Sequence, residues 1–177
     1  MKRLPALVVL AAAVVLAAPI ASPQSFSVEL GHTTGPEQPI HFPHVKHPGA
    51  LRMNCLYCHY AAEKSEVANI PAVSICIGCH KMALTDRPEI QKLTAYWNAG
   101  REPPWIHVYT LPDHVKFNHM RHVKAGLACQ TCHGPVQTMQ VVYRYSSLKM
   151  GWCIECHRAR LKDPLYPATM DCFVCHH

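Results

Sequence analysis

The hydrophobic pattern of the chain begins with an unbroken apolar segment. Residues 4–21 carry no charge and are almost wholly apolar, and Lys2 and Arg3 come directly before them. A positive start followed by an apolar stretch is typical of an export signal. The segment is also at the lower limit of the length that crosses a bilayer as a helix, about 20 residues. We therefore expect residues 1–25 to be a signal peptide that is removed, or an N-terminal hydrophobic helix that is kept as a membrane anchor.

Residues 86–100 have the apolar spacing of an amphipathic helix. Ile90, Leu93 and Trp97 recur every three or four residues, which predicts one apolar stripe. The segment also carries start and stop signals, namely Asp86 as the cap, Pro88 in the first turn, Glu89 as the partner in a capping box, and Gly100 at the end. We expect the stripe to pack in the core rather than to form a site.

Few other regular elements are predicted. Residues 101–112 are rich in proline and are expected to be an extended linker. Residues 140–145, with the sequence QVVYRY, are predicted to form a short strand. The chain is short of long apolar periodic segments, so something besides side chains is expected to fill its centre. The predicted fold class is therefore mostly irregular with short α-helices.

The charge balance excludes one class of partner. Lys and Arg number 17 against 11 Asp and Glu, which gives a formal net charge of +6. The positive side chains are scattered along the chain rather than clustered, and this argues against binding of nucleic acid.

The cysteines carry the strongest chemical signal. All ten occur in five copies of the pattern C-x-x-C-H, in which a histidine follows the second cysteine each time. The cysteines are Cys55 and Cys58, Cys76 and Cys79, Cys129 and Cys132, Cys153 and Cys156, and Cys172 and Cys175. The histidines that follow them are His59, His80, His133, His157 and His176.

This pattern is typical of covalent haem c attachment. Two intervening residues separate the thiols by about one helical turn, which suits thioether bonds to the two vinyl groups on one porphyrin edge. The histidine then projects beneath the ring as the proximal iron ligand. Structural zinc or disulfides would use the cysteines, but neither explains a histidine after every pair. We predict five covalently bound haem c groups in one pentahaem cytochrome c domain, residues 26–177, with a short helical turn after each motif.

The haem motifs belong to an internal repeat. The pattern F-x-H-x-x-H occurs at residues 42–47 and again at 117–122, and each copy is followed by two C-x-x-C-H motifs. This spacing predicts a duplicated two-haem unit, with repeat 1 at about residues 40–100 and repeat 2 at about 115–160. The C-terminal segment, residues 161–177, adds the fifth haem.

Five haem irons need five further axial ligands if each iron is six-coordinate. The two F-x-H-x-x-H copies offer four candidates, namely His44, His47, His119 and His122. One histidine of each turn would serve the local haem and the other a neighbouring haem. His114 and Met150 are the alternatives for the fifth position, and the choice affects the potential, because methionine raises it relative to histidine. His32, His41 and His107 lack repeat partners and are expected to be surface residues.

Longer stretches resemble known cytochromes. The repeat is similar to that of small multihaem class III cytochromes. Four stretches between residues 40 and 160 resemble the pentahaem cytochrome c subunit of alternative complex III, a bacterial quinol-oxidising complex of the inner membrane. They are CLYCHYAAEKSEVANIPAVSICIGCHK, PPWIHVYTLPDHVKFNHMRHV, CQTCHGPVQTMQVVY and LKMGWCIECHR. Relatives often carry histidine at the position of Tyr109, and this departure bears on the identity of the fifth ligand.

The resemblance implies an electron-transfer subunit rather than an enzyme, with no catalytic residue. Its partners would be an iron–sulfur, molybdopterin-like subunit, polytopic quinol-binding subunits and a monohaem cytochrome c. Electrons would pass to that cytochrome, to a soluble carrier or to a terminal oxidase. The chain would lie on the periplasmic side of the bacterial inner membrane, exported and either anchored or released.

Other functions stay open at this point. A free periplasmic shuttle cytochrome is favoured if the N-terminal segment is removed, and related subunits also accompany molybdopterin oxidoreductases. A multihaem enzyme of the nitrite- or hydroxylamine-converting type would need an open iron site. The supply of histidines allows every iron to be six-coordinate, which favours electron transfer.

Overall fold

The computed structural model describes residues 34–177, so the predicted signal or anchor segment lies outside the described residues. Short helices joined by loops make up this part of the chain, and no strand forms in it. In chain order the helices are η1 (Val45–Ala50), α1 (Cys55–Cys58), η2 (Tyr60–Glu63), α2 (Val73–His80), α3 (Pro88–Asn98), α4 (His119–Lys124), α5 (Cys129–His133), η3 (Val136–Thr138), α6 (Met150–Ala159) and η4 (Cys172–Val174). None of the described helices is long and apolar enough to cross a membrane. The prediction of a mostly irregular chain with short α-helices is confirmed.

The expected strand at residues 140–145 is wrong. These residues form neither helix nor strand, and Ser146 alone makes an isolated bridge. A strand needs paired neighbours to be stable, and here a side chain takes that role. The backbone N–H of Tyr145 donates to the hydroxyl of Tyr109 at 3.0 Å. The proline-rich residues 101–112 form neither helix nor strand, as predicted. Through Tyr109 they are hydrogen-bonded to residues 143–145.

The prediction of a helical turn after each C-x-x-C-H motif is wrong in position, because the helical turns coincide with the motifs. α1, α5 and η4 each begin at the first cysteine of a motif, and α2 and α6 contain their motifs. Residues three apart lie on the same face of a helix, so the turn brings both sulfurs to one side. Asn54 and Asp171 are the N-cap residues of α1 and η4. Each side chain accepts a hydrogen bond from the backbone N–H two residues further on, at 2.9 and 3.0 Å.

α3 confirms the predicted helix. Pro88 occupies its first turn, and Gly100, with a φ of 63°, follows its end. The predicted cap at Asp86 is wrong, because Arg87 occupies the N-cap position and makes no side-chain capping bond. Glu89 does not complete a capping box either, since its carboxylate accepts a backbone N–H from the segment before η1 at 2.7 Å.

The apolar stripe of α3 is only partly as predicted. Leu93 is 5% exposed and Ile90 packs against the same cluster, but Trp97 is 45% exposed. Tyr96 packs against the cluster in its place. The buried face of α3 is therefore turned by one residue from the predicted stripe.

Apolar side chains bury little surface in this chain. Among residues 34–177 the buried apolar side chains are Ile40, Ala61, Ala62, Val73, Ile77, Leu93 and Met139. Ile40, Val73, Ile77 and Leu93 make one cluster where α2 packs on α3. A chain of this length ordinarily buries roughly two thirds of the surface that its unfolded form exposes. The small apolar core indicates that a further component completes the interior.

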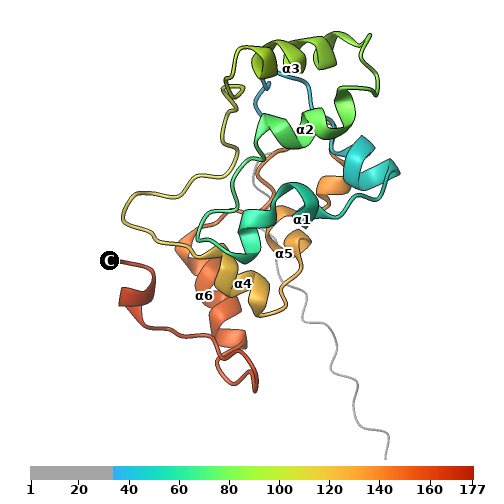
Figure 1. The fold of residues 1–177 in the computed structure, drawn as a ribbon. Coiled ribbons are helices and arrows are strands. Elements are labelled where there is room, and N and C mark those ends of the chain that lie inside the picture. Colours follow the sequence, from blue (N-terminus) through green and yellow to red (C-terminus); the bar gives the residue numbers. More distant parts are fainter. Residues whose placement is uncertain (1–33) are drawn as a thin grey trace, which may run out of the picture.

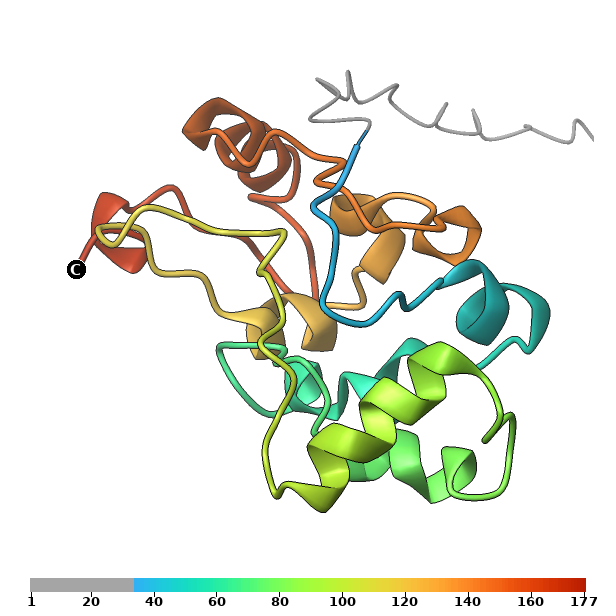
Figure 2. The same ribbon diagram turned by 90° about the horizontal axis from the view of Figure 1, so that it is seen from above.

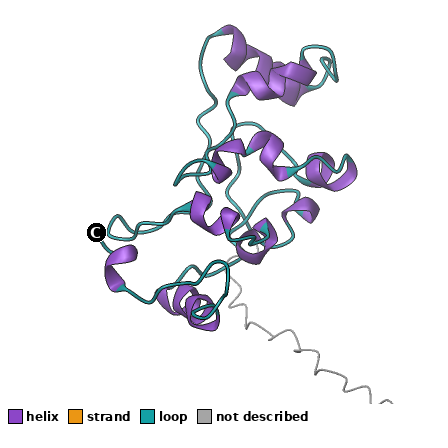
Figure 3. Cartoon of the chain, turned by 60° about the horizontal axis from the view of Figure 1, so that its bottom comes forward, coloured by secondary structure: helices purple, strands orange, loops and turns teal. Residues whose placement is uncertain are grey.

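The helices follow one another from one end of the molecule to the other (Figure 1). α2 and α3 lie side by side at one end, α1 and α5 lie in the middle, and α6 and the C-terminal segment lie at the opposite end. The view from above also separates the C-terminal turn and α6 from α2 and α3 (Figure 2). Loops account for much of the described chain between the helices (Figure 3).

Candidate functional site

The ten motif cysteines are free thiols, set in pairs on their helical turns. Burial raises the pKa of several of them and brings that of Cys132 to about 11. Within residues 34–177, no three His, Cys, Asp or Glu side chains converge as a structural zinc site requires. The thiol pairs have the geometry of one helical turn each, which suits attachment to one edge of a porphyrin.

The backbone orients four of the five motif histidines. In each of them the Nδ1–H donates to a main-chain carbonyl at 2.7–3.0 Å. The pairs are His59 with Asn69, His80 with Ala83, His157 with Thr169, and His176 with His114. Such a bond determines the tautomer and leaves the lone pair of Nε2 free for a metal.

Four motif histidines each face a second histidine. The ring centroids in these pairs are 5.8–6.4 Å apart. The pairs are His80 with His47, His133 with His119, His157 with His122, and His176 with His114. Two imidazoles on opposite sides of one metal, with bonds of about 2 Å and ring centres about 1.2 Å behind the ligating atoms, have centroids roughly 6.3 Å apart. The spacing therefore fits one haem iron between the rings of each pair.

His44 and the remaining motif histidine, His59, interact through their charges. The pKa of His44 is lowered to about 4, first by burial and then by the charges of His59 and His47. The Nδ1 atom of His44 is buried and has no hydrogen-bonding partner in the described part of the chain. Metals bind the neutral form of imidazole, so this environment suits a ligand.

A phenylalanine arranges the two histidines of each F-x-H-x-x-H segment. In both copies the ring of the first histidine meets the phenylalanine edge-on, and the plane of the second lies at 24–30° to it. The centroid distances are 4.9 Å for Phe42–His44, 4.4 Å for Phe42–His47, 4.8 Å for Phe117–His119 and 4.3 Å for Phe117–His122. No role for these phenylalanines was predicted from the sequence, although their place in the repeated pattern was the available signal.

The C-terminal part of the chain matches a known family. Residues 115–177 fit the family described as cytochrome c7 and related cytochrome c. This part of the chain is a cytochrome c7-like multihaem domain. The match covers the predicted repeat 2 together with the C-terminal haem segment, and it implies covalently bound haem c and electron transfer. No curated protein matches the chain.

Within the cytochrome c7-like domain, the ring of Tyr109 packs against His133. The ring of Tyr109 meets it edge-on at 4.5 Å, and that of His119 lies nearly parallel to it at 6.4 Å. Burial is the main cause that lowers the pKa of His133 to about 4. The Tyr109 hydroxyl donates to the carbonyl of Tyr143 at 3.3 Å. Tyr109 therefore supports a motif histidine by packing.

The geometry favours His114 over Met150 for the fifth position. The ring of His114 stacks on that of His176 at 5.8 Å, with 17° between the planes. The same residue also accepts the Nδ1–H of His176 through its carbonyl, at 3.0 Å. Met150 is 64% exposed at the start of α6.

The other histidines lie apart from these pairs. His41 and His107 are exposed, as predicted. The Nδ1–H of His177 donates to the carbonyl of Phe173 at 3.1 Å. His32 was also predicted to be a surface residue, and it lies outside the described residues.

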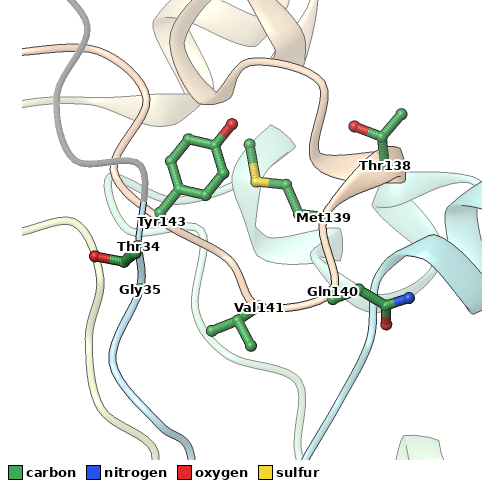
Figure 4. Close-up of a pocket in the computed structure, with 7 residues that line it drawn as sticks. All are labelled: Thr34, Gly35, Thr138, Met139, Gln140, Val141 and Tyr143. Atoms are coloured by element: carbon green, nitrogen blue, oxygen red, sulfur yellow. The ribbon is translucent and has the colours of Figure 1, made fainter.

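Two hollows lie in the described surface. The larger, about 440 Å³, lies between Thr34 and Gly35 on one side and residues 138–143 on the other (Figure 4), and Tyr143 is the one titratable side chain that lines it. The second, about 300 Å³, opens beside Cys58 of the first motif. Its position suits the edge of a haem rather than a separate substrate.

Proposed function

We propose that the chain is an electron-transfer subunit with five covalently bound haem c groups. It passes electrons from a quinol-oxidising membrane complex, through an iron–sulfur subunit, to a cytochrome c or a terminal oxidase. The observation that carries the proposal is that four of the five C-x-x-C-H histidines face a second histidine, with ring centroids 5.8–6.4 Å apart. The fifth, His59, is among the groups that lower the pKa of His44. The cytochrome c7-like match of residues 115–177 supports its general part.

The same residue pattern would hold haem in both halves of the chain. Each pair of motif cysteines would form the two thioether bonds to one haem. The proposed axial pairs are His59 with His44, His80 with His47, His133 with His119, His157 with His122, and His176 with His114. The first histidine of each F-x-H-x-x-H segment thus serves the first motif of its unit, and the second histidine serves the second motif. This equivalence supports a duplicated two-haem unit with a C-terminal addition.

Haem supplies one-electron redox chemistry, and the chain determines what the iron can contact. Two histidines bound to one iron would leave no position there for a substrate. The low pKa values of His44 and His133, about 4, keep both rings neutral at physiological pH. This arrangement favours relay over a nitrite- or hydroxylamine-converting reaction, which needs an open iron site.

The partners and the location are the more specific part of the proposal. The resemblance of residues 40–160 to the pentahaem subunit of alternative complex III supports an iron–sulfur, molybdopterin-like partner, polytopic quinol-binding subunits and a monohaem cytochrome c. The export-type pattern of residues 1–25 supports a site on the periplasmic side of the bacterial inner membrane.

Purification of the native protein tests this proposal. We expect the chain to be extracted from membranes with detergent, together with a polytopic subunit and an iron–sulfur subunit. Its haems should become reduced when a quinol is added to the purified assembly, because the quinol-oxidising partner supplies the electrons. Recovery of the chain alone in the soluble fraction, with no reduction by quinol, would instead indicate a free shuttle cytochrome.

A further inference from the structure

The first and second C-x-x-C-H motifs are neighbours in space. Their facing histidines, His44 and His47, share the turn that starts η1, and the ring of Phe42 contacts both. Burial raises the pKa of the Cys76 thiol in the second motif, and Cys58 of the first motif adds to this effect. The two motifs are therefore linked by the histidines that share one turn, and their thiols are close enough to influence each other.

The third and fourth motifs are related in the same way. Their facing histidines, His119 and His122, share α4 with the same ring geometry. The ring centroids of His119 and His133 of the third motif are 6.4 Å apart, and those of His122 and His157 of the fourth motif are 6.1 Å apart. The second half of the chain thus repeats the relation found in the first half.

The two halves meet through the first and third motifs. Burial raises the pKa of the Cys129 thiol in the third motif, and Cys55 of the first motif adds to this effect. His119, which faces His133 of the third motif, donates its Nδ1–H at 2.9 Å to the carbonyl of Glu66, in the segment that follows the first motif. The backbone N–H groups at the start of α4 donate to carbonyls just beyond η2 at 3.1 Å, which holds the halves together.

The fifth motif lies beside the fourth. Burial raises the pKa of Cys153, and Cys175 of the fifth motif is the next cause. The Nδ1–H of His157 donates at 2.7 Å to the carbonyl of Thr169, in the segment that leads to the fifth motif. The backbone N–H of Lys116 donates to the carbonyl of Cys175 at 2.8 Å, which ties the fifth motif to the segment before α4.

We infer that the attachment motifs lie in one unbranched row, in the order second, first, third, fourth, fifth. The positions of the helices agree, because α2 lies at one end, α1 and α5 in the middle, and α6 and the C-terminal segment at the other end (Figure 1). The functional role of this row rests on the proposed function, because redox partners would exchange electrons with the haems at its two ends. Those ends are the second motif, at residues 76–80, and the fifth, at residues 172–176. The motif that comes first in the chain is interior.

Redox titration of single-ligand variants of the holoprotein tests this order. Methionine in place of a distal histidine raises the potential of that haem, so the haem stays reduced while the others titrate. A reduced haem carries one positive charge less, which lowers the potentials of its nearest neighbours. His44→Met should therefore lower the potentials of two other haems, the second and third. His47→Met should lower that of one, the first.

His114→Met is the matched control for an end position and should lower the potential of the fourth haem alone. In the reverse result, His47→Met would lower the potentials of two haems and His44→Met that of one. That result would overturn the inferred order and favour a row in which the motifs follow their order in the sequence. Proton nuclear Overhauser contacts between haem methyl groups of the fully reduced, unmutated protein give the same information without a substitution. Contacts between the first and third haems support the row, and contacts between the second and third haems in their place refute it. Both measurements use the isolated cytochrome, so they can fail while the partner assignment stands, or succeed while it fails.

Discussion

A chain in which serine replaces all ten motif cysteines is expected to lose its fold. Its far-ultraviolet circular dichroism should lose most of the helical signal, and heating should give no cooperative transition. Among residues 34–177 the buried apolar side chains are few and four of them lie in one cluster, between α2 and α3. α1, α4 and α5 have 4, 6 and 5 residues, which is too short for helices to be stable in water on their own.

The control for this experiment is His41→Ala in the haem-bearing protein. His41 is exposed and faces no motif histidine in the described structure, so this variant should keep its haems and unfold cooperatively. A sharp thermal transition in the serine-substituted chain would show that the side chains alone make a sufficient core. That result would contradict the role of haem as the main buried component.

The His114→Ala variant is expected to open one iron to external ligands. The ring of His114 faces that of His176 at 5.8 Å, so its removal leaves the fifth haem with an empty axial position. The reduced variant should show a high-spin component and bind carbon monoxide at about one fifth of its haem, because one of five centres is affected. The unsubstituted reduced protein should bind essentially none.

Two further variants decide between the candidate ligands. His107→Ala and Met150→Ala remove side chains that are exposed in the structure, and both should leave the low-spin spectrum unchanged. Carbon monoxide binding by Met150→Ala, but not by His114→Ala, would assign the fifth position to methionine. Extensive binding by the unsubstituted protein would point to an open site and to an enzyme.

The attachment residues and most of the candidate ligands could be predicted from the sequence, because they lie only a few residues apart in the chain. Cysteines three apart and a histidine after them lie on one helical turn, and a repeated F-x-H-x-x-H needs no tertiary information to be recognised. The alternatives for the fifth ligand could not be separated in this way. His114 and His176 are 62 residues apart in the chain, and only folding brings the carbonyl and ring of one to the other.

The errors in the predicted fold have the same origin. Asp86 and Glu89 have the sequence of a capping box, but Glu89 instead accepts the N–H of His41, 48 residues away, and the side chain of Lys92. The order of the motifs also depends on a long-range contact, between the start of α4 and the residues just beyond η2. The segment at residues 140–145 has the composition of a strand, yet no partner strand lies beside it in the described structure.

The mass of the denatured native chain tests the central claim most directly. If every C-x-x-C-H motif forms two thioether bonds, the chain will retain its pigment after unfolding and extraction with acidified solvent. Mass spectrometry should then give the polypeptide plus five haem groups, and proteolytic fragments should carry one haem at each motif. A mass equal to that of the bare polypeptide, with the colour lost on extraction, would contradict the account.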